Sequence, residues 1–336
     1  MKTALARLLG GADLADAEMS AVMATIMDGA ATAAQVGAFL TALRVKGETV
    51  EELVATVRVL RERAVELRTT SSVVDTCGTG GDGLGTFNVS TAAAFVAAAA
   101  GAKVAKHGNR ASSGKVGAAD VLEALGAAVE LGPEAASRCL ERCGITFLFA
   151  PIYHPAVRHV AAARRELGFR TLFNLTGPLC NPAGARRQVI GVFAREWLEP
   201  VAETLRHLGS EHVLVVHGGD GSDEITPAAA TSVAELKGGE IVSYEIEPED
   251  FAIARCASSE LAGGDAAENA RLLREVLAGA GGPRSDATAL NAGAAIHVSG
   301  IALSLAGGVA RAREILRTSD ALRVLEAFIA ESHAPA

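Results

Sequence analysis

Residues 73–91 read Val-Val-Asp-Thr-Cys-Gly-Thr-Gly-Gly-Asp-Gly-Leu-Gly-Thr-Phe-Asn-Val-Ser-Thr, and this stretch decides the fold. Its two valines are a short β-branched run, which predicts the end of a strand. Gly78, Gly80 and Gly81 allow positive φ and a close approach of the backbone, so the loop can aim several N–H groups at one anion. The Ala-rich run 92–100 then predicts a helix that Ser90 or Thr91 could cap. Strand, glycine loop and helix N-terminus together predict a phosphate site.

A basic segment follows, Lys-Val-Ala-Lys-His-Gly-Asn-Arg at 103–110. It would bring the positive charges of Lys106 and Arg110 to the predicted phosphate site. The glycine loop alone is weak evidence, because many such loops are only turns. No third glycine of a dinucleotide fingerprint lies inside the helix start, and no Gly-Lys-Ser/Thr of a P-loop follows. The combination of the loop with the basic segment is what favours a phosphate site over a turn.

Size and composition narrow the function classes. The 336 residues are enough for two unequal domains with a substantial core. The net charge of −8 argues against a general nucleic-acid or membrane-surface binder, whose footprint is basic. Five scattered cysteines do not form a disulfide pattern, and the apolar run 92–100 is shorter than the roughly 18 residues of a membrane span. We therefore expect a cytoplasmic protein.

Residues 1–70 have a helical pattern throughout. Val36, Phe39 and Leu43 recur with helical spacing, and Thr49 with Glu52 predicts a capping box at the start of another helix. Because no strand pattern interrupts this region, it predicts a small all-helical N-terminal domain.

From Ser72 onward, short apolar runs alternate with helical stretches, which predicts a larger α/β domain with a mostly parallel central sheet. The expected strands are 73–76, 103–106, 129–131, 147–150, 188–193, 213–217 and 241–246. The expected helices are 91–100, 119–125, 133–143, 197–208, 266–278, 286–303, 308–316 and 319–331. We expect the helical domain 1–70 to be joined by a helical insert, 154–183, and the α/β domain to comprise 71–153 and 184–336.

A second loop is acidic. Asp223 and Glu224 follow the strand 213–217 within a glycine-rich run. Adjacent carboxylates on a loop suit Mg²⁺, which prefers oxygen ligands and bridges to substrate phosphates, although a turn with solvated acids has the same pattern. Ligands of such sheets bind at the carboxyl ends of the strands, where both loops would meet. His107, His154 and His217 are too widely separated to match a zinc pattern.

Together, Gly-Thr-Gly-Gly-Asp, Asn-Val-Ser-Thr and Lys-His-Gly-Asn-Arg resemble the phosphoribosyl pyrophosphate site of the anthranilate phosphoribosyltransferase family. The resemblance covers nearly the whole chain, including 35–49, 119–126, His154-Pro155-Ala156, 170–183, Asp223-Glu224 and Asn291-Ala292. It implies a cytoplasmic homodimer, formed through the helical domain. The implied reaction joins anthranilate to phosphoribosyl pyrophosphate and releases pyrophosphate, in tryptophan biosynthesis, with two Mg²⁺ ions in each active site.

The resemblance also implies roles for individual residues. Anthranilate would meet Gly78, Asn109 and Arg164, and the metal ions would meet Ser90, Asp223 and Glu224. His107 is the first candidate for a general base by position, and a structural role for it is about as well supported. The residues expected around phosphoribosyl pyrophosphate are Gly78, Gly81, Asp82, Thr86, Asn88, Val89, Ser90, Thr91, Lys106, His107, Gly108, Asn109, Arg110, Ala111, Ser112, Ser113, Gly114 and Ala118.

The sequence departs from the family pattern at two places. After Lys-His-Gly-Asn-Arg the family has a serine-rich run, and here Gly114, Val116 and Ala118 replace hydroxyls that would bond phosphate. The Pro-Val that precedes the anthranilate arginine is Ala162-Ala163. Both changes bear on individual contacts more than on the reaction.

Two alternatives stay open at this point. A pyrimidine nucleoside phosphorylase shares the implied fold and cleaves the same sugar bond with inorganic phosphate, and Mg²⁺ dependence would separate the two enzymes. A transferase-like protein that binds nucleic acid would need a broad basic surface, which the net charge of −8 disfavours.

Overall fold

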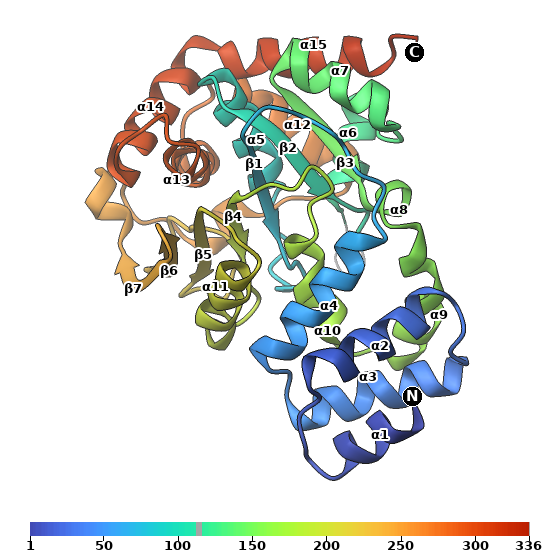
Figure 1. Ribbon diagram of the computed structural model, residues 1–336. Coiled ribbons are helices and arrows are strands. Elements are labelled where there is room, and N and C mark those ends of the chain that lie inside the picture. Colours follow the sequence, from blue (N-terminus) through green and yellow to red (C-terminus); the bar gives the residue numbers. More distant parts are fainter. Residues whose placement is uncertain (112–115, 336) are drawn as a thin grey trace.

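The computed structural model describes residues 1–111 and 116–335. A bundle of helices formed by the N-terminal part lies beside a larger α/β part, as Figure 1 shows. The fold class expected from the sequence is confirmed. The bundle contains α1 (Lys2–Leu9), α2 (Asp16–Met27), α3 (Ala33–Lys46) and α4 (Val50–Glu62).

Capping residues explain where the bundle helices begin. At α4 the Glu52 amide donates to Thr49 Oγ1 (3.3 Å) and the Thr49 amide donates to Glu52 Oε2 (2.9 Å), so the predicted capping box is confirmed. The buried Glu52 carboxylate also accepts from Lys46 Nζ (3.0 Å) and from the Leu14 amide (3.0 Å). One carboxylate therefore ties the start of α4 to the end of α3 and to the segment before α2.

The α/β part is built on one seven-stranded sheet with the order β3-β2-β1-β4-β5-β6-β7. The first five strands are parallel, and the last two add antiparallel pairings at one edge. Their bounds are β1 Val73–Gly78, β2 Lys103–Gly108, β3 Ile145–Phe149, β4 Arg187–Gly191, β5 His212–Gly218, β6 Thr231–Lys237 and β7 Glu240–Ile246.

One expected strand was wrong and one strand was missed. Residues 129–131 are not a strand: Val129 and Leu131 are buried because they pack into the core, not because they join the sheet. The sequence analysis also missed β6, which pairs with β7 through a two-residue turn at Gly238 and Gly239, both with positive φ (60° and 87°). Two glycines between alternating runs are a hairpin signal that could have revealed this strand.

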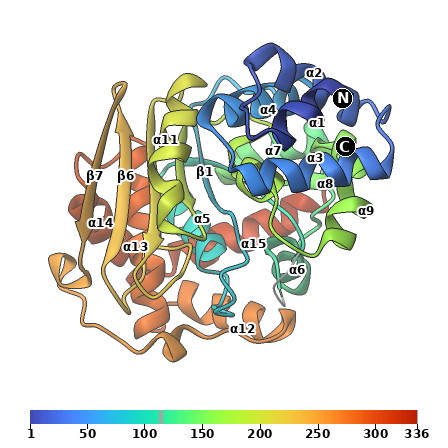
Figure 2. The ribbon, with the colours of Figure 1, turned by 90° about the horizontal axis from the view of Figure 1, so that it is seen from below.

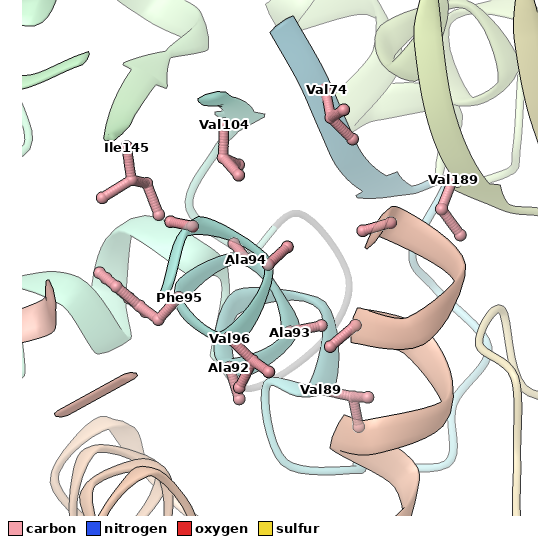
Figure 3. Packing of buried hydrophobic residues seen from close by; sticks show 14 of the residues in the cluster. Val74, Val89, Ala92, Ala93, Ala94, Phe95, Val96, Val104, Ile145 and Val189 are labelled. Atoms are coloured by element: carbon pink, nitrogen blue, oxygen red, sulfur yellow. The ribbon is translucent and has the colours of Figure 1, made fainter. Parts of the chain in front are cut away.

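Helices cover both faces of the sheet. On one face α5 (Val89–Ala99) packs against β1, β2 and α13 (Pro283–Val298), and Figure 3 shows it among Val74, Val104, Ile145 and Val189 of four strands. All of its alanines except Ala99 are buried, which lets the helix approach the sheet closely. The other helices of this part are α6 (Ala118–Ala124), α7 (Pro133–Cys143), α11 (Leu198–His207), α12 (Ala266–Leu277), α14 (Leu305–Thr318) and α15 (Asp320–Ser332).

The opposite face of the sheet shares its core with the bundle. Alternate residues of β5, Val213 and Val215, belong to the same buried cluster as the bundle helices, whereas Leu214 and Val216 belong to the α5 cluster. Helix α11 packs against β5, β6 and α4 and joins the two regions, which Figure 2 shows from below. The apolar core therefore continues from the sheet into the bundle.

Between β3 and β4 the chain returns to the bundle. This connection contains α8 (Ala150–Tyr153), α9 (Arg158–Leu167) and α10 (Leu172–Thr176). Helix α9 packs against α2 and α3, and α10 packs against α3 and α4. Short 3-10 helices occur at Pro155–Val157, Gly177–Leu179, Arg195–Trp197, Pro248–Phe251 and Ser258–Leu261. Within the described ranges, no helix is both long and apolar enough for a membrane crossing.

Candidate active site

Two loops meet where β1, β4 and β5 end. The Gly80 amide, in the loop after β1, donates to Oδ2 of Asp223, in the loop after β5 (2.7 Å). The close approach needs glycine on both neighbouring strands. A Cβ on Gly78 would lie 2.3 Å from Asp223 Oδ2, and one on Gly191 would lie 1.5 Å from the backbone oxygen of Asp223. The glycine loop and the acidic loop therefore form one surface, at the sheet end where ligands of such folds bind.

The second carboxylate faces the start of α5. Glu224 Oε1 accepts from the Ser90 amide (3.2 Å), at the positive end of that helix. Burial, and then the neighbouring Asp223 charge, raise the pKa of Glu224 to about 8. Burial, followed by the charge of Asp82, raises the pKa of Asp223 to about 6. Two adjacent, partly buried carboxylates with raised pKa values fit a cation, and Ser90 adds a hydroxyl oxygen nearby.

Lys106 lies under this surface. It is the fourth residue of β2 and is almost fully buried. Its Nζ donates to the Thr76 carbonyl (2.5 Å) and to Ser90 Oγ (3.3 Å), so its charge lies between β1 and the N-terminus of α5. The structure thus brings together the predicted lysine, helix start and acidic pair. An ammonium group and helix N–H groups converging on one point suit a phosphate ligand.

Two buried side chains support these loops, and the sequence analysis gave neither a role. Asn291 of α13 holds the residue after the acidic pair: its Oδ1 accepts from the Ile225 amide (3.0 Å) and its Nδ2 donates to the Ile225 carbonyl (2.8 Å). Asp75 of β1 accepts from the His107 amide (3.0 Å) and from Asn181 Nδ2 (2.7 Å). Burial raises the pKa of Asp75 to about 6. A single acidic residue within a short strand was the sequence signal that could have marked Asp75 as a buried supporting residue.

His107 and His154 lie side by side, with ring centroids 5.0 Å apart. Burial is the main cause that lowers the pKa of His107 to about 3 and that of His154 to about 4. Within the described ranges, neither ring nitrogen of His107 has a hydrogen-bond partner. Both rings are therefore neutral near pH 7, and a group with a pKa near 3 is a weak base.

Two arginines, Arg164 and Arg170, have different surroundings. Arg164 lies over the Phe173 ring (5.4 Å to the centroid), and burial lowers its pKa with no acid of the described part to offset it. Arg170 lies over Phe193 (4.2 Å) and donates to the Gly81 carbonyl in the glycine loop. In the sequence analysis Arg170 entered only through the family match over 170–183. Its contact joins positions 89 residues apart, so no local pattern signals it.

Comparisons with known proteins agree along the whole chain. Residues 2–64 match the helical bundle domain of a glycosyl transferase family, and residues 70–322 match its a/b domain. Anthranilate phosphoribosyltransferase of Rubrobacter xylanophilus is 54% identical over 98% of this chain and 96% of its own length. The chain belongs to the anthranilate phosphoribosyltransferase family.

Solved structures of the anthranilate phosphoribosyltransferase family have the same fold. The enzyme from Thermus thermophilus has a TM-score of 0.94 at 45% identity, with coverage of 98% of this chain and 99% of that one. The enzyme from Saccharomyces cerevisiae, solved in complex with PRPP and Mg, has a TM-score of 0.89 at 29% identity. The match covers 98% of this chain and 97% of the yeast chain.

The other residues expected from the family resemblance lie around the same loops. Val89 and Thr91 are in the first turn of α5, and Asn88 Oδ1 accepts from Asn269 Nδ2 (3.0 Å). Thr86 forms an isolated bridge with Ala262, which anchors the far end of the glycine loop. Asp82 accepts from the Leu84 amide (3.1 Å) within that loop.

The segment after β2 is only partly described. Gly108 lies against Phe147 and Ala118, where a Cβ would be 2.8 Å and 3.3 Å from their side chains. Asn109 is exposed and accepts from the Arg110 amide (2.7 Å). Arg110 pairs with Asp120 (3.1 Å) and Glu123 (2.5 Å), and Asp120 also accepts from the Ala111 amide (3.1 Å). The Arg110 guanidinium is thus held by two carboxylates at the start of the segment after β2. Ser112, Ser113 and Gly114 lie outside the described residues.

Proposed function

We propose that this protein transfers the 5-phosphoribosyl group from phosphoribosyl pyrophosphate to the amine of anthranilate, giving N-(5-phosphoribosyl)anthranilate and pyrophosphate in tryptophan biosynthesis. The observation that carries the proposal is the convergence of the glycine loop, Lys106 and the pair Asp223 and Glu224 at one end of the sheet. Membership in the enzyme family, over nearly the whole chain, supports the same reaction.

The site is suited to stabilising a leaving pyrophosphate. Breaking the bond between the ribose carbon and the pyrophosphate oxygen leaves negative charge on the pyrophosphate, so groups that bind this charge lower the barrier. Lys106 supplies a buried ammonium, and the amides of the glycine loop and of the first turn of α5 supply oriented N–H donors. Thr91 Oγ1 is buried without a partner in the described part and supplies a further polar group. We assign the phosphoribosyl pyrophosphate residues given in the sequence analysis to this part of the site.

Magnesium fits the acidic part of the site. When bound, Mg²⁺ would neutralise part of the charge that develops on the departing pyrophosphate. We assign two ions to each site, with Asp223, Glu224 and Ser90 as protein ligands. Their oxygens are hard donors, and the pKa values of the two partly buried carboxylates are raised, so a cation would stabilise their charged forms.

Arg164 is the proposed partner of the anthranilate carboxylate, with Gly78 and Asn109 beside the acceptor. A partly buried guanidinium that is not offset by an acid of the described chain is ready to bind an anion. The aromatic amine is already a nucleophile, so orientation matters more than a strong base. Neutral His107 is consistent with this, because its buried ring supplies polar atoms and no charge.

We also propose a cytoplasmic homodimer that forms through the helical domain, residues 1–70 with the insert 154–183; residues 71–153 and 184–336 would then form the α/β domain. Two large apolar side chains of the bundle support the dimer, since Leu9 is 79% exposed and Val45 is 82% exposed. Light scattering on the purified protein tests it: Val45→Lys should shift the mass towards that of a monomer.

Anthranilate fluorescence tests the reaction. When the purified protein is mixed with anthranilate, phosphoribosyl pyrophosphate and Mg²⁺, the anthranilate fluorescence should fall as anthranilate is consumed. Without Mg²⁺ the fluorescence should stay constant. A pyrimidine nucleoside with inorganic phosphate is the matched control for the phosphorylase alternative. Phosphorolysis without anthranilate consumption would reject the proposed reaction.

A further inference from the structure

A second polar cluster lies at the other end of the sheet. It consists of His212, the first residue of β5, Glu235 of β6 and His297 in the last turn of α13. One ligand atom from each lies within 4.8 Å of the other two. The acidic loop follows the far end of β5, so roughly 20 Å of strand separates the two places. None of the contacts described for the active site includes these three residues.

The hydrogen bonds around His297 leave one ring nitrogen facing an anion. Nδ1 of His297 lies 3.0 Å from the carbonyl oxygen of Ala302, so Nδ1 carries the proton and donates it. In the neutral ring Nε2 then has a lone pair, and this atom is 3.6 Å from Oε1 of Glu235. A lone pair that faces a carboxylate in a nearly buried place is unfavourable unless a cation or a second proton lies between them.

Glu235 is oriented in the same way. Its Oε2 accepts from the Tyr244 hydroxyl (2.8 Å), which leaves Oε1 directed at both histidines. The described chain therefore supplies two imidazole nitrogens and one carboxylate oxygen that point at a common position.

We propose that His212, Glu235 and His297 bind a divalent transition-metal ion of the Zn²⁺ class, at a site separate from the active site. Two histidines and one carboxylate are a known zinc ligand set, with water in the fourth position. A carbonyl on the other nitrogen of a metal-bound histidine is the usual arrangement, and Ala302 provides it here.

The distances allow the ion with a small adjustment. Zinc ligands in a tetrahedral site lie about 3.4 Å apart, given bonds of about 2.0–2.1 Å. Glu235 Oε1 is 3.6 Å from His297 Nε2 and 2.7 Å from His212 Nε2. The shorter distance is a hydrogen bond, and the metal would replace its proton. The side chain of Glu235 is 18% exposed, against 6% for His212 and 7% for His297, so water and the ion reach the site past the carboxylate.

The site would stabilise the elements that carry the active-site loops. It joins β5 and β6, which lead into and out of the segment that contains Asp223, to α13, which carries Asn291. A bound ion would therefore raise the stability of this part of the fold and take no part in the chemistry.

Zinc titration of the full-length, tag-free protein tests the proposal, after removal of metals with a chelator. Wild type should bind one Zn²⁺ at the site, and free Zn²⁺ at 100 times the Kd should raise Tm by roughly 4 °C. His297→Gln and Glu235→Gln should weaken this binding more than about 100-fold, beyond the effect of losing an outer-shell partner. Co²⁺ should give the visible absorption of a four-coordinate ion in wild type and not in these variants.

Two control variants separate this site from other ligands. The double variant Asp223→Asn with Glu224→Gln removes the active-site carboxylates, and His207→Gln removes an exposed surface histidine. Both should keep the zinc stoichiometry and the Tm shift. The proposal is overturned if wild type binds no Zn²⁺, if His297→Gln and Glu235→Gln bind as wild type does, or if only the double variant loses it. If one cluster variant fails to fold, the other cluster variant compared with the double variant decides the matter.

Discussion

Replacement of Gly191 by alanine tests the closeness of the two active-site loops. Gly191 ends β4, and an added Cβ would lie 1.5 Å from the backbone oxygen of Asp223 and 2.4 Å from its carbonyl carbon. A carbon–oxygen contact of at least about 3.3 Å would require the loop to move by roughly 1.8 Å. The atom that must move is backbone, so a change of rotamer cannot relieve the contact.

The displacement gives the expected size of the effect. A misplacement of about 1 Å in a catalytic constellation can cost about 100-fold in rate, so we expect kcat/KM to fall by at least that factor. Overpacking costs about 1–3 kcal/mol, which for a chain of this length lowers Tm by only about 1–4 °C. Activity should therefore fall far more than stability, and the half-saturating concentration of Mg²⁺ should rise.

The assay is the loss of anthranilate fluorescence at several Mg²⁺ concentrations, together with thermal unfolding. Gly281→Ala is the matched control, because its Cβ meets no atom within 4 Å and its φ lies outside the left-handed region. A Gly191→Ala enzyme with nearly wild-type activity and an unchanged Mg²⁺ requirement would refute the argument that these glycines position the metal ligands.

Four further changes test separate parts of the site. Asp223→Asn with Glu224→Gln should abolish Mg²⁺-dependent turnover, and circular dichroism should show an intact fold. Arg164→Ala should raise KM for anthranilate about 10-fold or more while kcat stays similar, and an unchanged KM would remove it from the acceptor site. Arg170→Ala, which frees the glycine loop, should raise KM for phosphoribosyl pyrophosphate by about 10-fold; Arg170→Lys is its control. Burial lowers the pKa of His154 to about 4, so the unfolded chain binds this proton more tightly than the folded one. The free energy of unfolding therefore falls as the pH is lowered from about 6.5 to about 4. When the pH is lowered from 7 to 5, the free energy of unfolding measured in urea should fall by about 2 kcal/mol less in His154→Gln than in wild type. An equal fall in the two proteins would contradict the buried neutral state of His154.

Much of the site could be predicted because it follows strand ends. Parallel strands put their carboxyl ends at one edge, so the loop after β1 and the loop that carries Asp223 had to meet there. Helix α5 could be predicted equally well, because alanine has the highest helix propensity and a run of alanines follows Ser90 and Thr91. These predictions needed only local pattern and one rule of sheet topology.

The supporting contacts could not be predicted because they join distant positions. Asn181 reaches Asp75 across 106 residues, and Arg170 reaches the glycine loop across 89. Arg110 is a further case: its ion pairs with Asp120 and Glu123 of α6 do not follow from its charge and position in the sequence. Which partner a charged side chain takes depends on tertiary packing that a single sequence does not display.

The core that runs from β5 through α11 into the bundle has a consequence for the evolution of this architecture. The face of α11 that packs against α4 would be left in water if the N-terminal helices were exchanged or lost. The two halves look like separable modules in the ribbon, but they cannot have been recombined freely with other partners. Any ancestor that gained or replaced its bundle had to change the apolar interface between α11 and the bundle at the same time.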